Sequence, residues 1–159
     1  MRVVPCQQDD ERKGAQGEWW VIAQIALIAS VLVAPPAGPG WPRALRLLAL
    51  PLGAGGLLLV VLGAAALGSS LTIFPRPRTR GRLVREGIFG MVRHPIYGGV
   101  ILLALAWAVW RMSLLHLGLA VIVALFFAAK AWKEERWLVN RFPDYTDYRR
   151  RVRGFIPHP

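Results

Sequence analysis

Cysteine is nearly absent from this 159-residue chain, and histidine is scarce. The single cysteine, Cys6, excludes an internal disulfide and a cluster of thiolate metal ligands. The three histidines, His94, His116 and His158, are too far apart in sequence to form a recognisable ligand motif. We therefore expect no metal site.

Charged residues are also few: they make up 18% of the chain, against 55% hydrophobic residues. This balance argues against a soluble fold, and the length predicts one domain. The net charge of +11 would suit a nucleic-acid partner. However, the basic residues flank apolar runs and do not form one basic face, so we expect anionic lipid headgroups and no nucleic acid as partner.

Residues 1–18 are polar and of mixed charge, and they predict a loose cytoplasmic tail. The apolar run at 19–34 opens on two tryptophans, which are typical of a membrane interface. It is slightly shorter than the roughly 20 residues of a usual span. A signal peptide is the alternative, but the acidic residues before the run argue against one.

The second apolar run, residues 44–74, is longer than a bilayer requires. It must tilt, kink near Pro51 or protrude from the membrane. Its four spaced glycines either allow another helix to pack closely or are small residues that face lipid. These glycines are Gly53, Gly56, Gly63 and Gly68.

Two further apolar segments, 96–110 and 113–131, are joined by Arg111 and Met112 alone. So short a joint predicts an antiparallel helical hairpin, whose second helix continues past the membrane to Leu138. The basic, aromatic stretch 141–153 suits an amphipathic tail that lies along the headgroups. We expect an all-α integral membrane protein with about four transmembrane helices, divided into a tail (1–18), two N-terminal spans (19–74) and a core (75–159).

The basic residues also predict an orientation. If the N-terminus, the 75–95 loop and the C-terminal tail share one side, that side holds 17 of the 20 lysines and arginines. The positive-inside rule then places both termini and this loop in the cytoplasm, at an inner or plasma membrane.

A polar hinge at 87–99 separates the apolar runs and contains His94 between Arg93 and Pro95. Because proline disfavours helical geometry at the residue before it, His94 is expected just before a helix begins. The free N–H groups of a helix start suit an anionic group of a ligand. An interfacial loop that faces lipid headgroups is the alternative.

The hairpin would return residues 130–138 to the hinge and bring Glu134 close to His94, so that ionisable groups from both ends line one pocket at the membrane surface. Glutamates that are solvated and paired with Lys130 or Lys133 are the alternative. The expected pocket residues are Arg93, His94, Tyr97, Lys130, Glu134 and Glu135.

Several motifs occur in an order along the chain that resembles that of a known family. Arg93-His94-Pro95-Ile96-Tyr97 is followed, after a hairpin, by Glu134-Glu135-Arg136-Trp137-Leu138 and by a tail containing Tyr145 and Tyr148. Over residues 81–157 this order resembles the isoprenylcysteine carboxyl methyltransferases, whose wider group includes the phospholipid N-methyltransferases. The first two spans carry no signature of that family.

The resemblance implies a membrane methyltransferase that uses S-adenosylmethionine in a cytoplasm-facing pocket. The lone Gly87-x-x-Gly90 is no dinucleotide fingerprint, because no strand precedes it. Glu134 would accept a hydrogen bond from the cofactor, and Phe89 would lie against it. The implied cofactor-binding residues are Gly81, Arg82, Leu83, Val84, Phe89, Arg93, His94, Pro95, Ile96, Tyr97 and Glu134.

The resemblance defines the residues that would bind the methyl acceptor less well than those that would bind the cofactor. Lys130 stands where some relatives have an arginine that engages the acceptor, and lysine lacks the bidentate fork that binds a carboxylate. A carboxylate or thiolate acceptor needs no base, whereas an amine would lose a proton to Glu135 or Tyr97. Lys130 and Glu135 are therefore the expected catalytic residues, and the acceptor is a lipophilic small molecule. The alternatives are a non-enzymatic scaffold that docks on anionic lipid and a nicotinamide-dependent reductase of related fold, against which the paired glutamates argue.

Overall fold

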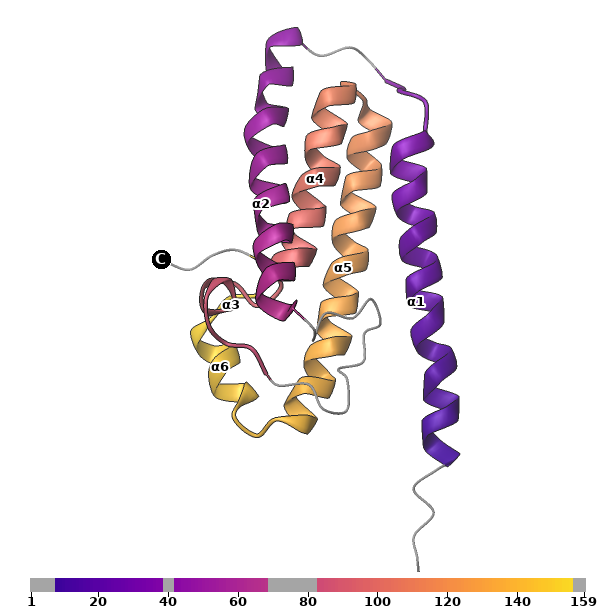
Figure 1. The fold of residues 1–159 in the computed structure, drawn as a ribbon. Helices are drawn as coiled ribbons and strands as arrows, with labels where there is room; N and C mark the ends of the chain where they lie inside the picture. Colours follow the sequence, from indigo (N-terminus) through magenta and orange to yellow (C-terminus); the bar gives the residue numbers. More distant parts are fainter. Residues whose placement is uncertain (1–7, 39–41, 69–82, 156–159) are drawn as a thin grey trace, which may run out of the picture.

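The computed structural model describes residues 8–38, 42–68 and 83–155, with backbone alone for 8–17. Its four long elements lie side by side (Figure 1). They are α1 (Gln8–Val33), α2 (Ala49–Leu67, preceded by the 3-10 helix η1, Arg43–Leu48), α4 (Pro95–Arg111) and α5 (Leu114–Arg141). The short helices α3 (Ile88–Met91) and α6 (Tyr145–Arg151) lie near one end of this bundle. The regular elements within the described residues are all helices, apart from one isolated bridge.

The predicted loose tail is wrong for residues 8–18, because α1 begins at Gln8. The residues from Gln8 to Glu18 lack proline and contain several good helix formers, so the helix extends well before the two tryptophans. Residues 1–7 lie outside the described part of the chain.

Pro51 does not break the second apolar run. It lies in the first turn of α2, where a missing backbone N–H costs no helical hydrogen bond. The change from η1 to α2 occurs just before it, between Leu48 and Ala49. The part of this run beyond Gly68 lies outside the described residues.

α2 packs closely on α4 through glycines, as the first interpretation of their spacing predicts. A Cβ built on Gly99 would lie 2.6 Å from the carbonyl oxygen of Gly56, and one on Gly63 would lie 2.8 Å from a side-chain carbon of Ile96. Gly53 is in ordinary contact distance of Ala106, and Gly68 has open space around it. Two of the four glycines thus allow the close approach.

The predicted helical hairpin is confirmed. α4 ends at Arg111, Met112 adopts a left-handed conformation with φ 53°, and the Ser113 side chain caps α5. The Ser113 hydroxyl also contacts both backbone polar groups of Ala37, at 2.9 and 3.0 Å, and so attaches the segment after α1 to the hairpin turn. α5 continues to Arg141, beyond the predicted Leu138.

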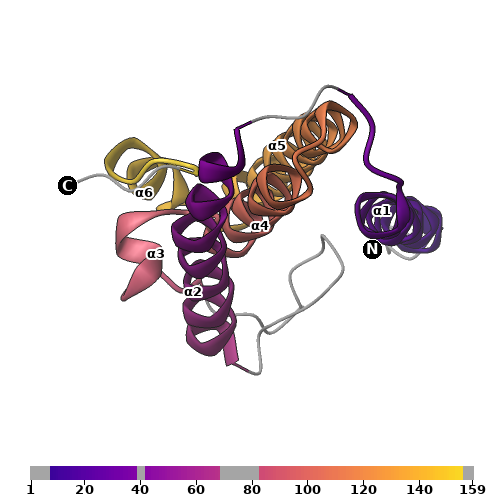
Figure 2. The same ribbon diagram turned by 90° about the horizontal axis from the view of Figure 1, so that it is seen from above.

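The bundle core is built mainly from α4 and α5. Small residues, Ala104, Ala108 and Ala120, let the helices approach, and Val123 and Phe127 fill the space between them. Val31 of α1 joins the same cluster. Seen along the bundle, α1 lies beside α5 and away from α2 (Figure 2).

Within the described part of the chain, two helical stretches are long and apolar enough to cross a membrane, Arg43–Leu67 and Leu114–Arg141, with mean hydropathies of 2.3 and 2.2. Glu18–Val33 and Pro95–Arg111 are apolar but shorter. Large apolar side chains on α2, among them Leu50, Leu57 and Leu58, are exposed.

Candidate functional site

The polar hinge is attached to the C-terminal tail by backbone hydrogen bonds. The Arg93 N–H donates to the Arg153 carbonyl and the His94 N–H to the Gly154 carbonyl, both at 2.9 Å. Val92, fully buried, forms a parallel bridge with Arg153. His94 is the N-cap of α4 and Pro95 its first residue, as predicted, because proline suits the first turn of a helix.

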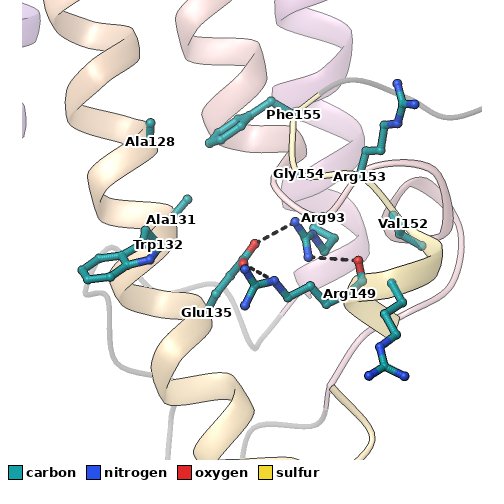
Figure 3. A pocket seen from close by; sticks show the side chains of 11 residues that line it. Arg93, Ala128, Ala131, Trp132, Glu135, Arg149, Val152, Arg153, Gly154 and Phe155 are labelled. Atoms are coloured by element: carbon teal, nitrogen blue, oxygen red, sulfur yellow. Dashed lines mark hydrogen bonds and ion pairs between the residues drawn. The ribbon is translucent and has the colours of Figure 1, made fainter. Parts of the chain in front are cut away.

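A buried carboxylate, that of Glu135, joins hinge, α5 and tail. Its Oε1 lies 2.9 Å from His94 Nε2 and 3.2 Å from an Arg93 guanidinium nitrogen. Its Oε2 lies 3.3 Å from Nε of Arg149 on α6. Figure 3 shows both guanidinium groups pointing at this carboxylate, and Arg93 also donates to the Arg149 carbonyl. We call Glu135 with Arg93, His94 and Arg149 the carboxylate clamp.

The preceding residue on α5 faces a different set of partners. Glu134 Oε2 accepts a hydrogen bond of 2.9 Å from the Tyr97 hydroxyl. One turn earlier, Lys130 Nζ donates to the side-chain oxygen of Gln24 on α1, at 2.6 Å. The Lys130 ammonium also lies over the Tyr97 ring, 5.4 Å from its centroid. The His94 ring stacks on Tyr97, so the two sets of polar groups adjoin.

A pocket of about 540 Å³ lies between α5 and the tail, on the clamp side of α5. Arginines from the hinge and the tail line part of it, and apolar surface from Ala128, Ala131, Trp132 and Phe155 lines the rest. Trp132 is 60% exposed, so the pocket reaches the outer, apolar surface of the bundle. Such a pocket suits a ligand with both anionic and apolar parts.

The tail docks on the hinge through tyrosines. Tyr145 and Tyr148 are buried, and the Tyr148 hydroxyl donates a hydrogen bond of 2.6 Å to the Phe89 carbonyl. Burial raises the pKa of Tyr148 to about 12 and raises the pKa of Tyr145 as well, so both stay neutral. Leu83 packs against the same pair.

The structure brings the six predicted pocket residues to one end of the bundle but pairs them differently. We expected Glu134 opposite His94; it is Glu135 that contacts His94, while Glu134 contacts Tyr97. Pro95 and Ile96 face Gly63 of α2. Phe89 is buried, Leu83 and Val84 are half-buried, and Gly81 and Arg82 lie outside the described residues.

Sequence reasoning missed Gln24 and Phe155, and it assigned Arg149, within the stretch 141–153, to the membrane surface and not to the site. For Gln24 a signal existed, since its spacing from Trp20 and Leu27 places it on an apolar helix face. For Arg149 and Phe155 the signal was weaker, because a basic, aromatic tail also suits a membrane surface. Whether the tail lies along headgroups stays a prediction.

These features define a class: a helical membrane protein with a polar site at one end, made by a hinge, a hairpin helix and a tail. The model of the phospholipid methyltransferase family matches residues 45–145. The chain belongs to this family, and the resemblance to isoprenylcysteine carboxyl methyltransferases is confirmed by its relatives.

Among the curated relatives, the cobalt-zinc-cadmium resistance protein CzcN of Cupriavidus metallidurans is 33% identical over 50% of this chain and 38% of its own length. Protein-S-isoprenylcysteine O-methyltransferase B of Arabidopsis thaliana is 31% identical over 64% of this chain and 57% of its own length. The chain thus spans about a third to two thirds of the curated relatives it matches.

The fold is shared with a solved structure, that of the eukaryotic intramembrane Ras methyltransferase (isoprenylcysteine carboxyl methyltransferase). The TM-score is 0.67 at 18% identity, over 98% of this chain and 54% of the other. Together with the apolar helices, this family and fold indicate an integral membrane protein.

Proposed function

We propose that this chain binds S-adenosylmethionine at the cytoplasmic end of its bundle and transfers the methyl group to a lipophilic acceptor in the membrane. The observation that carries the proposal is the meeting of hinge, α5 and tail, where His94, Tyr97, Glu134 and Glu135 come together from residues some forty positions apart.

The residues present fit this cofactor. The pocket volume of about 540 Å³ is in the range of small-molecule sites. Arg93 lines the pocket together with three arginines of the tail, Arg149, Arg150 and Arg153, and their positive charge suits the carboxylate of the cofactor. The aromatic faces of Trp132 and Phe155 suit a cationic or planar group.

When bound, S-adenosylmethionine would supply an electrophilic methyl group, and its transfer to an acceptor, with the thioether as leaving group, requires an aligned acceptor more than it requires strong acid–base catalysis. The chain's contribution is to hold both partners rigidly. The carboxylate clamp fixes the hinge against α5 and the tail, so His94 and Tyr97 are held in place at the start of α4. The cofactor-binding residues predicted from the sequence would hold the donor at the end of the bundle where α4 begins.

Glu135 and Glu134 differ in their suitability as a base. Glu135 already receives three donors, which stabilise its charged form and make it a poor proton acceptor. Glu134 has one described partner, the Tyr97 hydroxyl, so the Tyr97–Glu134 pair is better placed to take a proton from an amine acceptor. In this proposal Glu135 is a positioning residue.

We further propose that α1, η1–α2, α4 and α5 all cross the membrane, with both termini and the site in the cytoplasm. The start of α1, the end of α5 and α6 lie toward the same end of the bundle (Figure 1). Most lysines and arginines lie in segments expected at that end, as the positive-inside rule requires.

Isothermal titration of the detergent-solubilised full chain with S-adenosylhomocysteine tests the proposal. We expect the parent to bind, and His94→Ala and Glu134→Ala to bind at least about tenfold more weakly, a change of about 1.4 kcal/mol. Asp147→Asn is the matched control, because this carboxylate is exposed and lies outside the pocket lining.

No heat from the parent, or equal binding by the two site variants, would contradict the proposal. A parallel titration with NADPH distinguishes the related reductase chemistry: we expect no binding of that cofactor.

A further inference from the structure

α1 docks on α5 through one narrow face. Trp20, Gln24, Leu27 and Val31 recur at spacings of four, three and four, so they share one side of the helix. The Trp20 ring lies 5.3 Å from that of Phe126, and Leu27 and Val31 pack in the bundle core. Gln24 is the one polar side chain among these four.

Gln24 meets a buried cation. Lys130 is 2% exposed, and its ammonium donates to the Gln24 oxygen at 2.6 Å. Its other described contacts are the faces of Tyr97 and Phe127, 5.4 and 5.8 Å from the ring centroids. Among the described residues no carboxylate lies within ion-pair distance of Lys130; Glu134, one turn further along α5, attracts the ammonium electrostatically but accepts its hydrogen bond from Tyr97.

This arrangement leaves the ammonium incompletely satisfied. A lysine has three N–H donors, and the described structure uses one of them on a neutral amide. Aromatic faces stabilise a cation, but less than an anion would at a desolvated position. A ligand with an anionic group would supply the missing partner.

We infer that Gln24 is a positioning residue for the acceptor: it holds the Lys130 ammonium so that the remaining N–H groups bind an anionic group of the acceptor, and α1 forms one wall of the acceptor site. This inference rests on the proposed function. The neutral amide of Gln24 fixes Lys130 and leaves its charge unpaired, whereas a glutamate at the same position would neutralise that charge.

A purely structural role for Gln24, that of attaching α1 to α5, makes a different prediction. It would weaken all ligands alike, or destabilise the fold, and would leave the preference between a charged and an uncharged ligand unchanged. The ratio of two affinities therefore separates the two roles.

The test measures binding of S-farnesylthioacetic acid and of its methyl ester to the full chain, by isothermal titration with S-adenosylhomocysteine present. These probes share a prenyl chain and differ in one negative charge. We expect the parent to prefer the acid roughly tenfold, as a charge-assisted hydrogen bond allows. Gln24→Leu should reduce this preference severalfold, and Gln24→Glu should abolish it because the new carboxylate takes the Lys130 charge.

Ser30→Ala is the matched control on α1, since the Ser30 hydroxyl is exposed and bonds within its own helix. It should keep the parent preference. Binding of S-adenosylhomocysteine, measured for every variant, should stay unchanged and reports that the fold is intact.

A parent that binds S-adenosylhomocysteine but does not prefer the acid, or Gln24 variants that keep the preference, would overturn the inference and leave the proposed function standing. A parent that fails to bind S-adenosylhomocysteine contradicts the proposed function itself.

Discussion

Two consecutive carboxylates on α5, Glu134 and Glu135, have different surroundings although they are adjacent in the sequence. Adjacent positions on a helix are rotated by about 100°, so one faces the carboxylate clamp and the other faces Tyr97. This rotation divides the polar end of the bundle into a clamp side, next to the tail, and a side next to α1.

Glu135→Gln tests the clamp. The substitution keeps the shape of the side chain but leaves Arg93 and Arg149 without a counter-charge at a site where Glu135 is 7% exposed. We expect a loss of about 3 kcal/mol, because breaking a buried ion pair leaves an uncompensated charge. Thermal unfolding in detergent measures it. Asp147→Asn, an exposed carboxylate, should change stability little; equal effects of the two would argue against the clamp.

Tyr148 predicts a pH dependence. Burial raises its pKa from 10.0 to about 12, so between these values the unfolded chain loses a proton that the folded chain keeps. Stability contributed by Tyr148 is therefore complete below pH 10 and is lost as the pH rises toward 12. Phenolate absorbance during an alkaline titration should show a component near pH 12 that Tyr148→Phe removes. Ionisation of this component near pH 10 would contradict the burial.

At the scale of elements, α2 and α4 depend on the absence of side chains at their crossing. Gly99→Ala would place a Cβ 2.6 Å from the Gly56 carbonyl oxygen and 3.0 Å from the Val60 nitrogen, both backbone atoms that cannot rotate away. We expect a loss of about 1–3 kcal/mol, measured by thermal unfolding in detergent.

Gly118→Ala is the matched control, because a Cβ there meets nothing within 4 Å and the residue lies within α5. It should be neutral or stabilise the helix by up to about 1 kcal/mol. If Gly99→Ala were as well tolerated, the close packing of α2 on α4 would be wrong.

Local chemistry explains what could be predicted from the sequence. The two-residue joint at Arg111 and Met112 allows little besides a hairpin, and Pro95 fixes the start of α4 after His94. Both depend on neighbours along the chain. The glycine spacing on α2 likewise indicated a packing face, although it did not distinguish Gly56 from Gly53.

The contacts that could not be predicted depend on which face each helix turns toward its neighbours. Which of Glu134 and Glu135 faces the hinge follows from the packing of α5 on α4, and the contact of Gln24 with Lys130 follows from the docking of α1. The hydrogen bonds between hinge and tail join backbone atoms, and no pattern of side chains in the sequence reveals them. They run from Arg93 to Arg153 and from His94 to Gly154.

At the scale of the whole molecule, the orientation can be tested with the lone cysteine. With the N-terminus in the cytoplasm, Cys6 should react with a membrane-impermeant maleimide only after the cells are permeabilised. Leu114→Cys in a Cys6→Ser background is the control, because Leu114 is exposed at the hairpin turn, which is expected on the opposite side. Labelling of Cys6 in intact cells would reverse the proposed orientation.

In the proposed arrangement the donor contacts two faces of α5, with Arg93 on the clamp side and Tyr97 and Glu134 on the side next to α1, and the acceptor approaches Lys130 beside α1. A soluble donor would reach this end of the bundle from the cytoplasm, while a lipophilic acceptor would reach Lys130 through the membrane. Gln24 of α1 and Arg149 of α6 each contribute a side chain that connects an outer element to the site.

The most direct measurement is transfer itself. The purified chain is incubated with S-adenosylmethionine labelled in its methyl group and with a total membrane lipid extract, and the label in the organic phase is counted and identified. The account predicts label in a lipophilic product with the parent and with Asp147→Asn, and about a tenfold or greater loss with His94→Ala and Glu134→Ala. Label that stays in the aqueous phase with the parent, or an undiminished yield with both site variants, would contradict it.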